Sequence, residues 1–99
     1  MLTKALLVRL EALPGREAEL ADFLAGARSI VMEEPSTVAW FAIRFGPSTF
    51  GVYDVFPDDG ARDAHLAGGV GRALGTNTGV LFSEPKIEKI DVLADKVPG

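Results

Sequence analysis

One residue in this chain has an unperturbed pKa close to neutral pH, and it is a histidine. His65 is the only histidine in the 99 residues. An unperturbed imidazole has a pKa of about 6.5 and exchanges protons at neutral pH. It follows the apolar segment 50–56, which ends before Asp58 and Asp59. This order places one candidate general base near the edge of a hydrophobic sheet. A helical histidine that contacts Asp58, Asp59 or solvent is the structural alternative.

Two charged residues interrupt segments that otherwise read as apolar strands. Arg44 follows the run 38–43, and Asp54 lies within 50–56. An unpaired charge inside a sheet is costly. We therefore expect each to lie at a strand end, to form an ion pair, or to face a polar cavity. Trp40 and Tyr53 in the same segments fit either a core or a pocket wall.

Other catalytic patterns are weak. One histidine without cysteines does not supply the converging ligands of a common transition-metal site. The serines lack the sequence of a nucleophile elbow, which argues against a Ser-His-Asp hydrolase. The segment 69–75 (GVGRALG) is rich in glycine, but it follows a predicted helix rather than a strand. It is therefore interpreted as a loose helix end and not as a nucleotide loop.

Composition narrows the class of protein. The chain carries ten basic and fourteen acidic residues, a net charge of -4. Nucleic acids and anionic membranes attract clustered positive charge, so neither is an expected partner. The absence of cysteine excludes disulfides and fits a cytoplasmic protein. The N-terminal apolar run is too short, and is interrupted too early by Arg9, for a signal peptide or membrane span.

Hydrophobic periodicity predicts a single domain over residues 1–99, with strands and helices alternating. Pro14 and Gly15 separate the first strand from the first helix, Pro35 ends that helix, and 46–48 marks a hairpin turn. Asp58 is a predicted helix N-cap. A break is expected near Gly68 and Gly69. The predicted elements are a strand over 4–12, a helix over 16–34, strands over 38–43 and 50–56, a helix from 58, and a strand over 87–93.

This order predicts an α+β fold, a ferredoxin-like βαββαβ unit with a four-stranded antiparallel sheet. Two helices cover only one face of such a sheet. The hairpin strands 38–43 and 50–56 are nevertheless apolar on both faces. A solvated face normally reads as polar, and a large exposed apolar patch is typical of an association site. We therefore expect a homodimer that packs through the sheet face.

The chain resembles the antibiotic biosynthesis monooxygenase family over nearly its whole length. The resemblance rests on the order of elements, on the helix entry 13–17 (LPGRE), and on 52–58 (VYDVFPD) leading to 64–66 (AHL). It implies a dimeric α/β barrel with a cavity between sheet and helices and with His65 at its wall. Relatives usually carry glutamate where this chain has Asp54. The haem-degrading branch is disfavoured, because the first strand has no asparagine and Trp40 lies on the second.

The resemblance also implies a function. We expect a cofactor-independent monooxygenase that acts on a quinol or another small phenolic or polycyclic aromatic substrate. His65 is the expected base, and no cofactor or metal is expected. The expected substrate pocket comprises Trp40, Phe41, Tyr53, Asp54 and Arg44. A non-catalytic dimer that binds a small ligand and an isomerase of the same fold are the alternatives.

Overall fold

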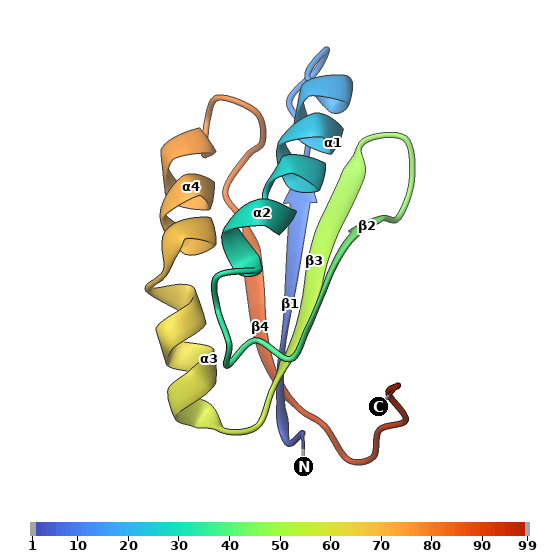
Figure 1. The fold of residues 1–99 in the computed structure, drawn as a ribbon. Coiled ribbons are helices and arrows are strands. Elements are labelled where there is room, and N and C mark those ends of the chain that lie inside the picture. Colours follow the sequence, from blue (N-terminus) through green and yellow to red (C-terminus); the bar gives the residue numbers. More distant parts are fainter. Residues whose placement is uncertain (1, 99) are drawn as a thin grey trace.

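A computed structural model describes residues 2–98 of the chain. Four strands form one sheet, and the helices lie together on one side of it (Figure 1). The elements in chain order are β1 (Lys4–Glu11), α1 (Glu17–Gly26), α2 (Arg28–Val31), β2 (Ala39–Arg44), β3 (Thr49–Phe56), α3 (Asp59–Leu66), α4 (Gly69–Asn77) and β4 (Lys86–Asp91).

The sheet has the order β2-β3-β1-β4, and every neighbouring pair is antiparallel. This is the ferredoxin-like arrangement, so the predicted α+β fold is confirmed. Val8 of β1 is paired with both Val52 of β3 and Ile87 of β4. Because side chains alternate along a strand, these partners share the inner face, toward the helices. The sheet is open in the single chain, so closure into a barrel stays a prediction.

The first predicted helix is wrong as a single element. α1 ends at Gly26, and α2 is a separate turn that ends at Val31. Glycine is a poor helix former, and the Ser29 hydroxyl donates to the Gly26 carbonyl at this point. Ala27 between α1 and α2 keeps helical backbone angles, and α2 ends at Val31, before the predicted end at Pro35. This early exit places Glu34 in a turn that approaches α3.

α3 and α4 meet at the predicted break. The Asp58 side chain accepts a hydrogen bond from the Ala61 amide at 2.8 Å, which confirms the N-cap. α3 ends at Leu66 and α4 begins at Gly69, so the break at 68–69 is also confirmed. The helical segment 69–77 is a correction to the expected loose end. A Cβ atom at Gly71 would lie 2.2 Å from the Leu66 carbonyl oxygen, so glycine permits the close helix junction.

Arg62 fixes α3 on the sheet. Its side chain is buried and donates to the backbone carbonyls of Ala5 and Ile90, each at 3.2 Å. A second guanidinium nitrogen binds Asp59 at 3.0 Å. Since His65 lies one turn further along α3, this anchor also positions the imidazole over the inner face.

The main core lies between the inner face and the helices. It is built from the inward residues of β1 and β3 together with apolar residues of the helices and of the loop before β4. Its leucine and phenylalanine members, all buried, are Leu10, Leu20, Leu24, Phe50, Leu74, Leu81 and Phe82.

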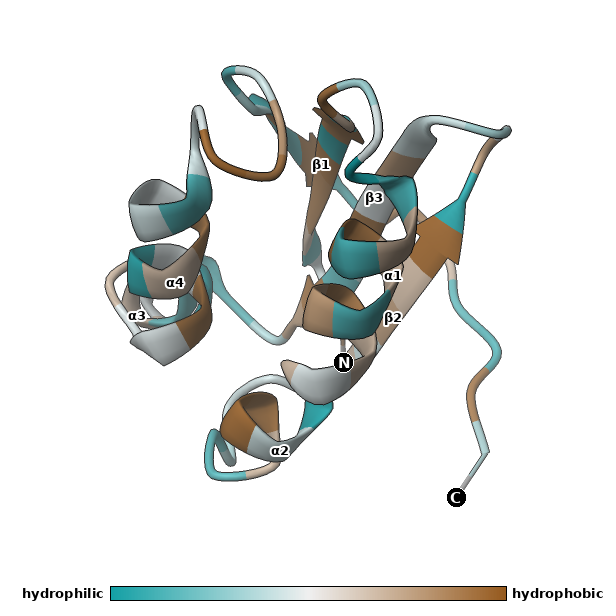
Figure 2. Cartoon of the chain, turned by 90° about the horizontal axis from the view of Figure 1, so that it is seen from above, coloured by the Kyte–Doolittle hydropathy of each residue, from teal (hydrophilic) through white to brown (hydrophobic). Residues whose placement is uncertain are grey.

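The outer face of the sheet carries no helix (Figure 2). A smaller cluster of Leu2, Ala5 and Val55, with Val92 against it, covers one end of this face. Elsewhere apolar side chains remain open, and Phe41 is 53% exposed. Both faces of β2 and β3 are thus apolar, although the helices of this chain cover only the inner face.

Candidate functional site

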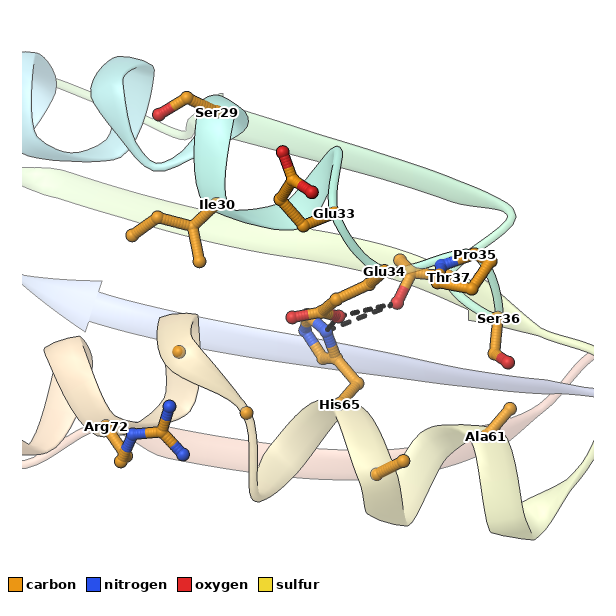
Figure 3. A pocket seen from close by; sticks show the side chains of 13 residues that line it. Ser29, Ile30, Glu33, Glu34, Pro35, Ser36, Thr37, Ala61, His65 and Arg72 are labelled. Carbon is orange, nitrogen blue, oxygen red and sulfur yellow. Dashed lines mark hydrogen bonds and ion pairs between the residues drawn. The ribbon is translucent and has the colours of Figure 1, made fainter.

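Three acid–base side chains meet between the sheet and the helices. Asp54 comes from the inner face of β3, His65 from α3, and Glu34 from the turn after α2. Figure 3 shows Glu34 and Thr37 approaching the imidazole from that turn. Segments distant in sequence are therefore joined through a single histidine ring.

Each imidazole nitrogen contacts one carboxylate. Nδ1 of His65 lies 2.5 Å from Glu34 Oε1, and Nε2 lies 2.6 Å from Asp54 Oδ2. The Thr37 hydroxyl donates to the same Glu34 oxygen at 2.8 Å. Facing lone pairs repel at such separations, so each contact needs a hydrogen between its atoms. The imidazole therefore shares protons with both carboxylates.

Asp54 is the most deeply buried member of this cluster. Its side chain is 1% exposed, against 6% for His65 and 20% for Glu34. Despite its closeness, the His65 contact lacks the direction of a regular hydrogen bond. Among residues 2–98, neither Asp54 oxygen has a regular hydrogen-bond partner. Burial raises the pKa of Asp54, and the neighbouring His65 offsets this only in part.

His65 responds to the same surroundings in the opposite sense. Burial lowers its pKa, but the contacts and charges of Asp54 and Glu34 together outweigh burial. The net effect raises the pKa of His65 above 6.5. The raised pKa and the two short contacts favour sharing of protons between the ring and both carboxylates. The expected alternative, contact with Asp58, Asp59 or solvent, is wrong.

An inner cavity lies on the Asp54 side of the imidazole. It has a volume of about 180 Å³ between the sheet and the junction of α3 and α4. Its wall is apolar apart from Asp54, His65 and Thr78, and the Thr78 hydroxyl is bonded to the Leu74 carbonyl. The apolar lining includes Leu6, Val8, Val52, Leu66, Val70, Leu74 and Ile87.

A second, larger hollow lies on the Glu34 side. This outer groove has a volume of about 610 Å³ and runs between the turn after α2 and helices α3 and α4. Figure 3 shows Arg72 and Ile30 facing it beyond the histidine. His65 lines both hollows, so its ring forms part of the wall between them.

The predicted pocket residues do not gather at one place. Trp40 pairs in register with Asp54 and shares its inner face, but it borders a separate surface depression. Arg44 lies at the end of β2, where its guanidinium donates to the Gly46 and Pro47 carbonyls. It stabilises the hairpin and lines neither hollow at His65.

Phe41 and Tyr53 lie on the other side of the sheet. They are paired with each other in adjacent strands, and the alternation of β3 directs Tyr53 away from Asp54. Tyr53 packs against the small outer cluster. Within one chain these two aromatic side chains are therefore separated from His65 by the sheet.

Sequence reasoning did not identify Glu34 as a site residue. The available signal was the acidic pair Glu33 and Glu34 immediately before Pro35, at a predicted helix end. Such a pair is usually solvated, and only the early end of α2 brings Glu34 to His65. Thr37, which orients the Glu34 carboxylate, was missed for the same reason.

No group of three or more acidic, histidine or cysteine residues in the described range has the arrangement of a metal site. Glu34 and Asp54 contact opposite edges of the His65 ring, so they do not converge on one point. Within the same range, every helix is too short or too polar to cross a membrane.

Comparison with solved structures gives a match of high sequence identity. The protein NE2512 from Nitrosomonas europaea, described as of unknown function, is 54% identical over 100% of this chain and 97% of its own. Its TM-score is 0.98. The chain belongs to the NE2512 family. No protein-family model matches it, and a search of curated proteins found no match.

More distant structures show the fold. A candidate antibiotic biosynthesis monooxygenase from Deinococcus radiodurans is 20% identical, with a TM-score of 0.79 over 97% of this chain and 99% of that one. SnoaB from Streptomyces nogalater, a cofactor-independent oxygenase, is 15% identical, with a TM-score of 0.76 over 94% and 95% of the two chains. They confirm the fold of the antibiotic biosynthesis monooxygenases that the sequence resemblance implied.

Proposed function

We propose that the protein is a cofactor-independent monooxygenase for a small quinol or phenol bound in the inner cavity. The observation that carries this proposal is the Asp54 carboxylate, buried in an apolar cavity, without a regular hydrogen bond and next to the only imidazole. The fold shared with SnoaB supports the reaction class. Asp54 thus brings a carboxylate oxygen, Oδ1, without a partner among residues 2–98 to the wall of an otherwise apolar space.

The geometry changes the role expected for His65. Both of its ring nitrogens are occupied by carboxylates, whereas Asp54 Oδ1 has no partner among the described residues. Asp54 is therefore the proposed acceptor of the substrate's hydroxyl proton. Burial raises its pKa and makes the carboxylate a stronger base than an exposed aspartate. His65 stabilises the charge and shares the proton.

The chemical step follows from the deprotonated substrate. The electron-rich anion passes an electron to dioxygen, and a ring carbon–oxygen bond forms. The ring C–H and the O–O bond then break, water leaves, and the remaining oxygen stays on the ring. Quinol and dioxygen thus give a hydroxyquinone anion, water and one proton. The apolar wall excludes bulk water from these intermediates.

Cavity volume selects the size of the substrate. An apolar cavity of about 150 Å³ holds one benzene molecule in another protein, whereas drug-sized ligands occupy about 300–1,000 Å³. The inner cavity, at about 180 Å³, fits one aromatic ring or a compact ring pair. The polycyclic substrate class of the sequence-based expectation is therefore not part of this proposal.

The proposal is tested by oxygen uptake with one-ring and two-ring quinols and labelled dioxygen. Asp54→Asn keeps the side-chain shape and removes the base, so the rate should fall by about 10²–10⁴. Tyr53→Phe, on the opposite face of the same strand, is the matched control and should retain activity. Equal turnover by wild type and Asp54→Asn would refute the role of Asp54.

Product analysis separates the alternatives. An isomerase would use the same base but return the proton to carbon, so no label from dioxygen would enter the product. A non-catalytic binding protein would be stabilised by a quinol without consuming oxygen. Either result would contradict the proposed oxygenation.

We also propose that two copies pair through the outer face of the sheet. Phe41 is half exposed there, and Ile43 and Tyr53 are only partly covered by their own chain. Burying this apolar surface against a second copy would supply the cover that the helices give to the inner face.

A further inference from the structure

The inner cavity and the outer groove are separated by a continuous chain of acid–base groups. From the cavity outward it runs from Asp54 through His65 to Glu34, with contacts of 2.6 Å and 2.5 Å. Side-chain exposure rises along this chain from 1% to 6% to 20%. It therefore begins at a buried carboxylate on an apolar cavity and ends at a carboxylate that reaches solvent.

The reaction leaves one proton inside the cavity wall. A hydroxyquinone is a vinylogous carboxylic acid, so it leaves as an anion at neutral pH while its proton remains with Asp54. The rest of the cavity wall gives this proton no other titratable group. This proton must leave through the series of acid–base groups before Asp54 can act as a base again.

We propose that Glu34 is the proton outlet of the site: it takes from His65 Nδ1 the proton collected by Asp54 and releases it to water in the outer groove. This inference rests on the proposed function. In the transfer, Asp54 carries its proton on Oδ2 and the neutral ring carries its hydrogen on Nδ1. Nε2 of His65 then receives the Asp54 proton while Nδ1 gives its own proton to Glu34 Oε1. The imidazole ends with the same number of protons as before, and Glu34 becomes the neutral acid.

Two features around Glu34 fit this role. The Thr37 hydroxyl donates to Oε1 at 2.8 Å and lies 3.4 Å from Nδ1, so it fixes the carboxylate against the ring. On the other side, Gly68 leaves room for Oε2, because a Cβ there would lie 3.1 Å from this oxygen. One Glu34 oxygen is thus held for the histidine, and the second is left beside a residue without a side chain.

Glu34 is a positioning and relay residue, because it does not touch the inner cavity. The matched control is Glu33→Gln: Glu33 lines the same outer groove, but within residues 2–98 no hydrogen bond or ion pair joins it to His65. Both variants remove one negative charge from the same turn. Any difference between them therefore isolates the contact with the imidazole.

The first readout does not need turnover. Because His65 is the only histidine, its ring resonances are followed in an NMR pH titration without overlap. Glu34→Gln should lower the pKa of His65 and change the Nδ1 signal, whereas Glu33→Gln should leave both close to wild type. An unchanged titration in Glu34→Gln would overturn the contact on which the outlet depends.

The second readout is buffer rescue of oxygen uptake. Glu34→Gln should lower kcat by about tenfold, with KM unchanged, since it affects proton transfer and not binding. Raising the concentration of a small buffer such as imidazole should restore most of this loss, while wild type and Glu33→Gln stay insensitive. Loss of kcat without buffer rescue would refute the outlet and leave the Asp54 base intact. An active Asp54→Asn would instead refute the proposed function.

Discussion

Replacing Asp54 by asparagine is expected to stabilise the protein at neutral pH while slowing the proposed oxygenation. The carboxylate is almost fully buried in an apolar wall, and burial raises its pKa above the ordinary 3.8. A raised pKa means that the folded state binds the proton more tightly than the unfolded chain does. At neutral pH the ionised side chain therefore reduces the free energy of unfolding.

The magnitude follows from this linkage. Each unit by which the folded-state pKa exceeds the unfolded value lowers the free energy of unfolding by about 1.4 kcal/mol, once the pH lies above both values. Asparagine cannot ionise and avoids this cost, but it also removes the charge that raises the pKa of His65, which offsets part of the gain. For a domain of this size, a gain of 1 kcal/mol raises Tm by about 4–8 °C. Below pH 3.8 the wild-type carboxyl is protonated in both states, so the gain should vanish there.

Urea and thermal unfolding at pH 7 and near pH 3.5 test this expectation. Asp63→Asn is the control, since Asp63 lies on α3 with its side chain 66% exposed, and its contact with Lys89 spans 3.9 Å. Such exposed pairs contribute little, so its Tm should change by less than about 2 °C. A less stable Asp54→Asn, with the same deficit at both pH values, would refute the reasoning. The carboxylate would then be a structural anchor of the imidazole.

Two further predictions concern the helix junction and the outer face. Gly71→Ala should destabilise the fold by about 1–3 kcal/mol, because its Cβ would meet the Leu66 carbonyl at 2.2 Å. Gly75→Ala is the control in the same helix: its Cβ meets nothing within 4 Å, so it should stabilise the fold by about 0.5–1 kcal/mol. Chemical denaturation compares the two variants. Equal changes in the free energy of unfolding would contradict the argument from close approach at Gly71. Phe41→Glu should convert a dimer to a monomer in sedimentation at micromolar concentration, whereas Val80→Glu, exposed in the loop after α4, should not. A wild-type monomer would end the dimer proposal.

The strands were predictable from sequence because their signals are local. Alternation assigned Leu6, Val8 and Leu10 to one face, and all three are buried beneath the helices. The helix N-cap at Asp58 was predictable for the same reason, because it depends only on adjacent residues. The division between α1 and α2 was missed because Gly26 was outweighed by a helical pattern that runs past it.

The candidate site was only partly predictable. His65 and Asp54 were identified by residue type, since a lone imidazole and a carboxylate in an apolar strand are both unusual. Glu34 depends on where a turn far along the chain approaches α3, which no periodicity encodes. The prediction for Phe41 and Tyr53 failed for a related reason. Their aromatic character suggested a pocket, but strand alternation places both on the face of the sheet that points away from Asp54.

Arg62 holds α3, and with it His65, independently of the residues that shape the inner cavity. Arg62 grips main-chain oxygens of Ala5 and Ile90, which every amino acid provides. Substitutions at Val8, Val52 or Ile87 can therefore enlarge or narrow the inner cavity without shifting the imidazole. If the proposed function holds, a scaffold built in this way can change its substrate preference through the cavity wall while its acid–base groups stay in place.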